Sequence, residues 1–377
     1  MRLTLVSPFD PSPADAALGA ERVGGVERVF AQVSRRLAAR GHDVTLVCSS
    51  SGPAATSSED GVRVVRAPRR ATVLQAPVAN LARSIQADTD VVHVAATYPF
   101  TTPSVLRKAR DLRVPSILDF HFEPAPSSAI GRLAAAAYRH VGPRHYNLAA
   151  LALVRSFAYG RSAPSLGRVP TERWRIVPNG VDPARFNAEG PAQEGDYLLY
   201  VGRLVHYKGL HVLIDALARL ADPPPLVVVG DGPELRRLSR QARVLGVDAR
   251  FLGRLPDDHL PPLYRGARCT VLPSVTGQES FGISLIESMA CGTPVVASRL
   301  AGVAEVARLG GLLAEPGDAA GLARRLDAAL EPKALPRGKP LAARVHAAFS
   351  WDAVTDRLES VYREVTGSPS GSAPAAA

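Results

Sequence analysis

Short runs of apolar residues alternate with longer segments of helical periodicity along the whole chain of 377 residues. Five of these runs in the first half predict strands, at residues 3–6, 44–48, 62–66, 91–94 and 116–119. Four in the second half predict strands that are apolar on both faces, at residues 197–201, 226–229, 270–272 and 295–298. Buried strands that alternate with helices are typical of parallel sheets covered by helices on both sides. The pattern therefore predicts an α/β protein in which a doubly wound, Rossmann-like arrangement occurs twice.

A segment dense in Gly, Pro, Asn and Asp, VPNGVDPARFNAEGPAQEGD at residues 177–196, separates the two halves. We therefore expect an N-terminal domain over residues 1–180 and a C-terminal domain over residues 181–350. A last helical pattern, residues 351–366, is expected to pack back on the first domain, and residues 367–377 are expected to form a disordered, low-complexity tail. Two such domains joined by a hinge would face a central cleft, the usual position of a ligand.

The charge of the chain changes this picture little. The net charge is +10, but only four of the 45 basic residues are lysine, an arginine bias that is typical of a GC-rich genome. The chain has no compact basic block, zinc-ligand spacing or RNA-binding strand, so no nucleic-acid partner is expected. Arg107, Lys108, Arg110 and Arg113 cluster in the first half. A diffuse basic surface is the favoured interpretation, and a weak peripheral contact with a membrane is the alternative.

The cysteines and the N-terminus bear on the compartment. Cys48, Cys269 and Cys291 are far apart in apolar surroundings and are expected to be buried free thiols. The apolar run in MRLTLVSPFD is too short for a signal peptide, and no apolar stretch reaches the roughly 18 residues of a membrane-spanning helix. We therefore expect a cytoplasmic protein.

The stretch TGQESFGISLIESMACGTPVV, residues 276–296, places Glu279 eight positions before Glu287. A helix is expected to begin near Phe281 or Gly282. The two carboxylates then lie roughly 10 Å apart, at about 1.5 Å of rise per residue. Glycosidases hold their pair closer, at about 5 Å in retaining and about 6.5–9.5 Å in inverting enzymes. The spacing suits the two ends of an extended ligand with a phosphate between them, bound by the amides of Phe281 and Gly282. An ordinary helix with two acidic residues is the alternative.

The stretch YVGRLVHYKG, residues 200–209, supplies cations to the same region. Arg203 and Lys208 follow the end of a predicted parallel strand, where side chains point into the ligand crevice of an open sheet. Two fixed cations there would neutralise a diphosphate without a metal. A surface lysine at the start of a helix is the alternative for Lys208.

Two glycine-containing turns are weaker signals. Gly24 and Gly25, in VGGVERV, open the first predicted helix and could bring backbone amides against a phosphate or sugar. The stretch VGDGPE at residues 229–234 is explained equally well by a strand-to-helix turn.

The motifs in this order and spacing resemble the retaining glycosyltransferases of the GT-B fold, in particular their family 4, the glycosyl transferases group 1. They are the Gly24-Gly25 pair, VPNGVD, YVGRLVHYKG, VGDGPE, FLGRLP and ESFGISLIESMACGTPVVAS. The resemblance covers nearly the whole chain and is strongest over residues 177–298. It implies metal-independent transfer of a hexosyl group, without a cofactor, from a nucleotide-diphosphate sugar to an acceptor hydroxyl on a small molecule, glycan or lipid. The donor is implied to be a UDP-sugar in preference to a GDP-sugar.

The resemblance also implies roles for single residues, with the donor bound mainly by the C-terminal domain and the acceptor by the N-terminal domain. Glu287 would hold the ribose, and Arg203 and Lys208 the diphosphate. Glu279 would hold the transferred sugar together with the amides of Phe281 and Gly282, and Gly24 and Gly25 would complete the phosphate site. The departing phosphate is thought to accept the proton of the acceptor in this family, so Glu279 would be a positioning residue and not a nucleophile.

The family usually presents a histidine from the N-terminal domain to the donor sugar. In SILDFHFEP the candidate is His121, although the familiar form has His followed directly by Asp. His121, Lys208 and Glu279 are therefore the candidate catalytic residues, with a structural histidine as the alternative for His121.

Other functions remain open at this point. A nucleotide-sugar epimerase shares the fold, whereas a phosphorylase would need a lysine for pyridoxal phosphate, and none of the four lysines is suitably placed. A nucleotide-binding regulator without turnover and a basic nucleic-acid binder are the alternatives from other classes. The sequence identifies neither the acceptor nor the sugar, and both a monomer and a homodimer are compatible with it.

Overall fold

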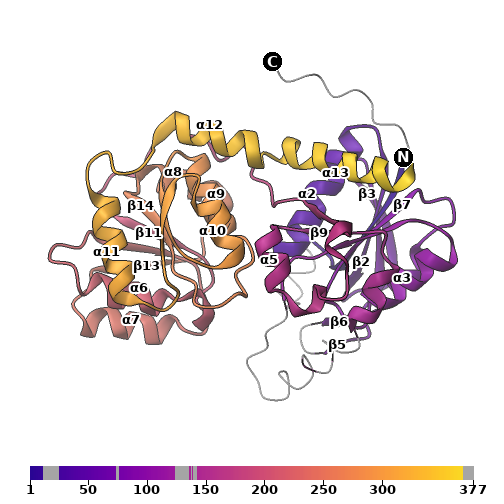
Figure 1. Cartoon of the computed structure of the whole chain (residues 1–377), viewed down its shortest axis with the longest axis horizontal. Helices are drawn as coiled ribbons and strands as arrows, with labels where there is room; N and C mark the ends of the chain where they lie inside the picture. The colour runs from indigo at the N-terminus through magenta and orange to yellow at the C-terminus, as the bar shows by residue number, and fades with distance from the viewer. Residues whose placement is uncertain (12–24, 74–75, 124–135, 137, 139–141, 368–377) are drawn as a thin grey trace. The chain divides into compact units, whose positions relative to one another are not determined.

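The computed structural model describes residues 1–11, 25–73, 76–123, 136, 138 and 142–367 (Figure 1). The chain divides into two compact units. The first consists of residues 1–178 together with 351–377, and the second of residues 179–350. Apart from Gly367, the predicted tail lies outside the described residues.

The first unit is built on an eight-stranded sheet in the order β10-β9-β8-β7-β1-β2-β4-β3. The strands are β1 (Arg2–Phe9), β2 (Asp43–Ser50), β3 (Ala55–Glu59), β4 (Val62–Pro68), β7 (Val91–Ala95), β8 (Ser116–Asp119), β9 (Leu151–Val154) and β10 (Trp174–Ile176). Every neighbouring pair is parallel except β3 with β4. A separate antiparallel pair consists of β5 (Ala71–Val73) and β6 (Ala76–Val78). The described α-helices of this unit are α2 (Gly25–Ala39), α3 (Thr102–Asp111), α5 (Phe157–Ser162) and α13 (Trp351–Thr366).

The second unit contains a six-stranded, entirely parallel sheet in the order β13-β12-β11-β14-β15-β16. Its strands are β11 (Leu198–Val201), β12 (Leu226–Val229), β13 (Ala249–Gly253), β14 (Cys269–Leu272), β15 (Val295–Ser298) and β16 (Gly311–Ala314). Its helices are α6 (Leu210–Leu217), α7 (Leu235–Val244), α8 (Leu260–Gly266), α9 (Ile283–Ala290), α10 (Ala301–Ala307), α11 (Ala319–Leu330) and α12 (Gly338–Phe349). This strand order is that of a Rossmann fold.

Apolar residues cover both faces of each sheet, as the strand pattern predicts. In β11, Leu199 packs into one hydrophobic cluster, and Leu198 and Tyr200 pack into another. Successive side chains of a strand point to opposite faces, so this alternation places a core on either side of the sheet. All nine strands predicted from the sequence are present, and the three cysteines are buried and form no disulfide. Both predictions are confirmed.

Several strands were not predicted, and most of them lie at sheet edges. In β13 the exposed Arg250 and Leu252 alternate with half-buried residues, so the strand lacks the continuous apolar run of a central strand. The strand β3, of sequence ATSSE, is polar and pairs only with β4. The described residues include no helix that is both long and apolar enough to cross a bilayer.

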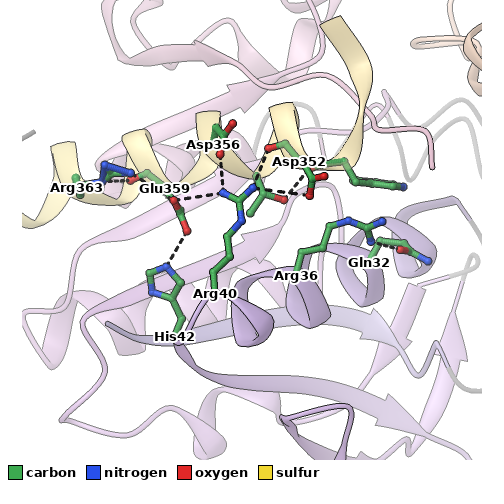
Figure 2. A network of polar contacts seen from close by, with 10 residues as sticks. Gln32, Arg36, Arg40, His42, Asp352, Asp356, Glu359 and Arg363 are labelled. Atoms are coloured by element: carbon green, nitrogen blue, oxygen red, sulfur yellow. Dashed lines mark hydrogen bonds and ion pairs between the residues drawn. The ribbon is translucent and has the colours of Figure 1, made fainter. Parts of the chain in front are cut away.

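The C-terminal helix α13 packs on α2 and β7 within the first unit. Figure 2 shows the polar part of this contact, in which Arg40 reaches three acidic residues of α13. Its guanidinium lies 2.6 Å from Asp356, 3.4 Å from Glu359 and 3.8 Å from Asp352. His42 Nε2 lies 3.0 Å from the same Glu359. The apolar part is fully covered, since residues such as Leu358 of α13 belong to the core of the first unit.

We predict that α13 is held mainly by its apolar face. The substitution Leu358→Ala removes a side chain that is only 2% exposed. It should cost about 2–5 kcal/mol and lower the melting temperature of the first unit by about 5–15 °C. The substitution Asp356→Ala breaks a solvent-exposed ion pair and should cost less than about 1 kcal/mol. Calorimetry of both variants tests this, and a larger loss for Asp356→Ala would contradict it.

Candidate active site

The strand order reverses in the second sheet between β11 and β14, which lie side by side. At such a switch point the connections leave in opposite directions, and a crevice opens outside the carboxyl ends of the two strands. Arg203 and Lys208 follow β11, and Glu279 follows β14, as do Phe281 and Gly282. Five of the six residues that the sequence predicts to bind the donor in the second unit lie on these two connections. The six residues are Arg203, Lys208, Glu279, Phe281, Gly282 and Glu287. Glu287 lies on α9, which continues the second connection.

A close backbone contact fixes the distance between the two connections. Gly209 has a φ of +71°, and a Cβ atom there would lie 1.9 Å from the carbonyl oxygen of Pro273. The amide of Val275 donates a 2.8 Å hydrogen bond to the carbonyl of Tyr207. Only glycine fits at position 209, because any side chain would push the loop after β11 away from the loop after β14.

Lys208 and Glu279 meet across this contact. The Nζ atom of Lys208 lies 2.5 Å from Oε2 of Glu279, and the two side chains are 17% and 10% exposed. The hydroxyl of Ser274 donates to the same carboxylate oxygen at 3.3 Å. Burial alone would lower the pKa of Lys208, but Glu279 and two neighbouring tyrosines outweigh burial and raise it. Lys208 therefore stays charged in a largely dry site.

The N-terminus of α9 lies beside this ion pair. The helix begins at Ile283 after Gly282, which has a φ of +84°, and so confirms the start expected from the sequence to within two residues. Phe281 is buried, and its ring packs edge-on against Phe349 with 5.7 Å between the ring centroids. Within the described residues, the amides of Phe281 and Gly282 have no hydrogen-bond acceptor. They can therefore bind an anion, favoured by the helix dipole.

Two further predicted residues differ in their surroundings. Glu287 accepts a 2.8 Å hydrogen bond from the hydroxyl of Tyr264, whose pKa is raised by burial and by the charge of Glu287. Arg203 is exposed, and its guanidinium has no ion-pair or hydrogen-bond partner in the part of the chain that the structure describes. Arg203 can therefore reach an incoming anion without first breaking a contact.

The glycine turns have different outcomes. Gly24 lies outside the described residues, whereas Gly25 is exposed at the start of α2 in the first unit. In VGDGPE, Gly230 and Gly232 pack against the backbone of Gly202 and Leu204, where a Cβ would lie 1.9 and 2.3 Å from the carbonyl oxygens. The glycines of VGDGPE thus serve the packing of the turn, which was one of the two interpretations open from the sequence.

His121 belongs to a buried polar cluster in the first unit, whose members come from β7, β8 and the segments that follow β8 and β9. Nη2 of Arg155 pairs with Oδ1 of Asp119 and lies 3.2 and 3.1 Å from the two ring nitrogens of His121. Oδ2 of Asp119 lies 3.0 Å from Nε2 of His121 and 3.2 Å from Nε2 of His93. Tyr362 of α13 completes the cluster, with its hydroxyl 2.7 Å from Nδ1 of His93.

The cluster determines the protonation of His121. Burial and the charge of Arg155 lower the pKa of His121 to about 4, despite the opposing effect of Asp119. Burial would raise the pKa of Asp119, but Arg155 and His121 hold it well below its ordinary value. The imidazole is therefore neutral near pH 7, with both nitrogens occupied inside the protein. A nitrogen of His121 can reach a sugar only if one of these contacts is exchanged.

The sequence reasoning missed the partners of the predicted residues. Arg155 and Tyr264 are the most important, since each contacts a site residue directly. Arg155 directly follows the apolar run of β9. A polar residue at the end of a parallel strand can be recognised in a sequence as a candidate site residue, but β9 itself was not predicted. Tyr264 lies on α8 and carries no comparable signal.

Comparisons with known proteins place the chain in a family. The model of "Glycosyl transferases group 1" matches residues 182–342, and that of "Glycosyltransferase Family 4" matches residues 23–185. The D-inositol 3-phosphate glycosyltransferase of Acidothermus cellulolyticus is 32% identical over 92% of this chain and 87% of its own length. The phosphatidyl-myo-inositol mannosyltransferase of Mycobacterium tuberculosis is 31% identical over 92% of this chain and 94% of its own.

The chain belongs to the group 1 glycosyltransferases. Its fold is similar to that of sucrose-phosphate synthase from Thermosynechococcus elongatus, with a TM-score of 0.76 and 23% identity over 98% of this chain and 100% of the other. HepE of Anabaena, solved in complex with UDP, gives a TM-score of 0.72 at 20% identity over 97% and 100% of the two chains. These likenesses confirm the predicted GT-B fold.

Membership in the group 1 glycosyltransferases makes the protein an enzyme and disfavours the regulator and nucleic-acid alternatives. The group 1 match contains all six donor-side candidates of the second unit, and the family 4 match contains Gly24, Gly25 and His121. The described residues include no group of three His, Cys, Asp or Glu side chains that could hold a metal. Metal independence and the roles of single residues stay predictions.

We predict that His121 makes the stability of this glycosyltransferase depend on pH. The folded-state pKa of about 4 lies below the ordinary value of 6.5. Between these pH values His121 is therefore protonated in the unfolded chain and neutral in the folded chain. This contribution to stability is present above pH 6.5 and is lost as the pH falls toward 4. The difference in unfolding free energy between the wild type and His121→Gln should therefore shrink by about 2–3 kcal/mol between pH 7.5 and 4.5.

Urea denaturation of the first unit at both pH values measures this difference. His259 is exposed in the second unit, so His259→Gln serves as the matched control and should show no such change. A constant difference for His121→Gln would show that the ring is protonated inside the folded protein, contrary to the geometry of the cluster.

Proposed function

We propose that this enzyme transfers a hexosyl group from a nucleotide-diphosphate sugar to an acceptor hydroxyl with retention of configuration and without a bound metal. The observation that carries the proposal is the Lys208–Glu279 pair at the switch point of the six-stranded sheet, beside the N-terminus of α9. A largely buried cation, an exposed free cation and unpaired amides on these two neighbouring connections suit a diphosphate.

The diphosphate is assigned to Arg203, Lys208 and the start of α9. When it binds, Lys208 exchanges the carboxylate of Glu279 for a phosphate, and Arg203 adds a second charge from solvent. These groups stabilise the negative charge that develops on the diphosphate as the bond from the anomeric carbon to the phosphate oxygen breaks. The acceptor oxygen forms the new bond to the same carbon, and its proton passes to the departing phosphate.

The two glutamates are assigned to the two ends of the donor. Glu287 lies about one turn into α9, where Tyr264 orients its carboxylate, and accepts hydrogen bonds from the ribose hydroxyls. Glu279, released by Lys208, accepts a hydrogen bond from a hydroxyl of the transferred sugar. Glu279 is a positioning residue in this proposal and forms no covalent intermediate.

The known proteins support the choice of donor. HepE of Anabaena was solved with UDP, with UDP and glucose, and with UDP-glucose. Two relatives that match most of the chain are, by name, a D-inositol 3-phosphate glycosyltransferase and a phosphatidyl-myo-inositol mannosyltransferase. We therefore propose a UDP-sugar in preference to a GDP-sugar, and an acceptor that carries a free hydroxyl.

The proposal is tested with a panel of UDP- and GDP-linked hexoses in the presence of EDTA. Release of free nucleotide, faster with an acceptor than without one, is the expected result, and NMR of the anomeric proton should show the configuration of the donor in the product. Absence of nucleotide release from every donor contradicts the proposal. A product of inverted configuration contradicts its stereochemistry alone.

We predict that Lys208→Ala lowers kcat/KM by about 10²–10³-fold, because the loss of one preorganised charge that stabilises the departing group typically has this effect. Lys333 is exposed in the same unit, so Lys333→Ala is the matched control and should keep full activity. Calorimetry separates this loss from unfolding. A folded Lys208→Ala enzyme with unchanged kcat/KM would remove Lys208 from the mechanism.

We predict that the two glutamates separate kinetically. The substitution Glu287→Gln weakens a hydrogen bond made equally in the ground and transition states, so it should raise the donor KM about tenfold with little change in kcat. The substitution Glu279→Gln acts next to the reacting carbon and should lower kcat more than it changes KM. Steady-state kinetics of both variants tests this prediction. If Glu287→Gln lowers kcat and Glu279→Gln raises the donor KM, the two glutamates bind the opposite ends of the donor from those proposed.

A further inference from the structure

The buried cluster around His121 reaches the C-terminal helix α13 through two side chains. The hydroxyl of Tyr362 lies 2.7 Å from Nδ1 of His93, and Nε2 of His93 lies 3.2 Å from Oδ2 of Asp119. The same carboxylate oxygen lies 3.0 Å from Nε2 of His121. All four side chains are buried. A network of polar contacts therefore connects α13 with a candidate catalytic residue.

The charge of Asp119 determines the direction of the hydrogen bonds in this network. Asp119 is ionised, because its pKa is held well below the ordinary value, and Arg155 pairs with its Oδ1. An ionised carboxylate only accepts hydrogen bonds, so Nε2 of His93 and Nε2 of His121 must each carry a hydrogen. A bare nitrogen at either place would set two acceptors against each other in a buried site, which is unfavourable.

Tyr362 fixes the other nitrogen of His93. Burial, followed by the charges of Asp119 and Glu359, raises the pKa of Tyr362, so its hydroxyl keeps its proton. Since Arg155 already balances the charge of Asp119, a second cation at His93 would be unfavourable in this buried site. His93 is therefore neutral with a bare Nδ1, and Tyr362 donates to it. This bond holds the His93 ring in the orientation in which Nε2 donates to Asp119.

The network acts on His121 because the two histidines share one oxygen of Asp119. Burial and Arg155 favour the neutral form of His121, and Asp119 favours its charged form. A hydrogen bond from His93 uses part of the acceptor capacity of Oδ2, so Asp119 stabilises a proton on His121 less strongly. The network thus helps to keep His121 neutral, with its hydrogen on Nε2 and a bare Nδ1.

The two nitrogens of His121 are not equally available to a ligand. Nε2 donates to the buried carboxylate of Asp119, which would lose a donor if this bond were broken. Nδ1 lies 3.2 Å from Nη2 of Arg155. When Arg155 gives up that contact, it keeps its bond to Asp119 and the 2.6 Å bond from Nη1 to the carbonyl of Val177. Nδ1 is therefore the nitrogen that is exchanged at lower cost.

We propose that Tyr362, acting through His93 and Asp119, holds His121 as a neutral ring with its hydrogen on Nε2, so that Nδ1 accepts a hydrogen bond from a hydroxyl of the donor sugar. The inference rests on the proposed function and on the prediction that His121 contacts this sugar. Tyr362 and His93 are positioning residues, since they act through other side chains. The C-terminal helix then contributes to the reaction as well as to the core of the first unit.

The first test is ¹⁵N NMR of the full-length enzyme with labelled histidine and without a ligand. The hydrogen-bearing and the bare nitrogen of a neutral imidazole have well-separated ¹⁵N shifts, and His93→Gln and His121→Gln assign the two rings. Near pH 7.5 both rings should carry their hydrogen on Nε2. A hydrogen on Nδ1 of His121, or on both of its nitrogens, overturns the proposal.

The second test is Tyr362→Phe, which removes the hydroxyl and keeps the ring. The pH at which His121 takes up a proton should rise by about one unit, because His93 no longer donates to Asp119 in a fixed orientation. The donor kcat/KM reports groups of the free enzyme. Its ratio between the variant and the wild type should therefore fall about threefold from pH 7.5 to pH 4.5. Loss of packing alone would not move the protonation of His121.

The matched control is Thr355→Val on the same helix. The hydroxyl of Thr355 is buried and donates to the carbonyl of Trp351 at 2.6 Å, outside the network. This variant should weaken α13 without changing the NMR titration of His121 or the pH dependence of kcat/KM. An unchanged titration in Tyr362→Phe, or an equal change in Thr355→Val, overturns the proposal. If the wild type releases no nucleotide from any donor, the proposed function fails, whereas the NMR still reports the state of His121, so the two failures are distinguishable.

Discussion

The contact between Gly209 and Pro273 sets the geometry on which the donor-side candidates depend. The loop after β11 comes so close to the loop after β14 that position 209 has no room for a side chain. The neighbouring Lys208 and Glu279 consequently reach each other although they are 71 residues apart in the chain. Neither loop alone could hold a charged side chain away from water, because an isolated buried charge is strongly unfavourable. The parallel sheet makes the contact possible, since its strand order brings these two loops to one edge.

The two units apply the same topology to different chemistry. Without the antiparallel β3, the strands of the first sheet follow the same order as those of the second sheet, with one further strand, β10, at the edge. Each unit therefore has a switch point at the carboxyl ends of its central strands. In the second unit this edge carries a buried lysine, a free arginine and the start of α9. In the first unit it carries aromatic rings and buried carboxylates. The same strand order thus carries different side chains at the two edges.

The sequence predicts the fold well because the patterns that indicate its strands and helices are local. Central parallel strands appear as apolar runs, and α9 appears between a glycine and the CGTPVV strand, so these elements are found without knowing their neighbours. The shared edge of Lys208 and Glu279 is also predictable, since each follows a recognised strand. Edge strands such as β13 are missed because they are half exposed and lose the continuous apolar pattern. The pairing of Asp119 with Arg155 is missed for another reason, because it depends on β9, whose existence had to be known first.

The Lys208–Glu279 pair is not explained by its contribution to folding. A buried ion pair contributes little net stability over an apolar pair of the same size, because both charges must leave water. Its presence therefore needs a reason other than folding. Without Glu279, Lys208 would be an uncompensated cation, and burial would lower its pKa and favour its neutral form. With Glu279 in contact, the lysine keeps its charge and position. In the proposed mechanism an incoming diphosphate displaces this one carboxylate, which then accepts a hydrogen bond from the donor sugar. The ion pair thus keeps both side chains paired and in place.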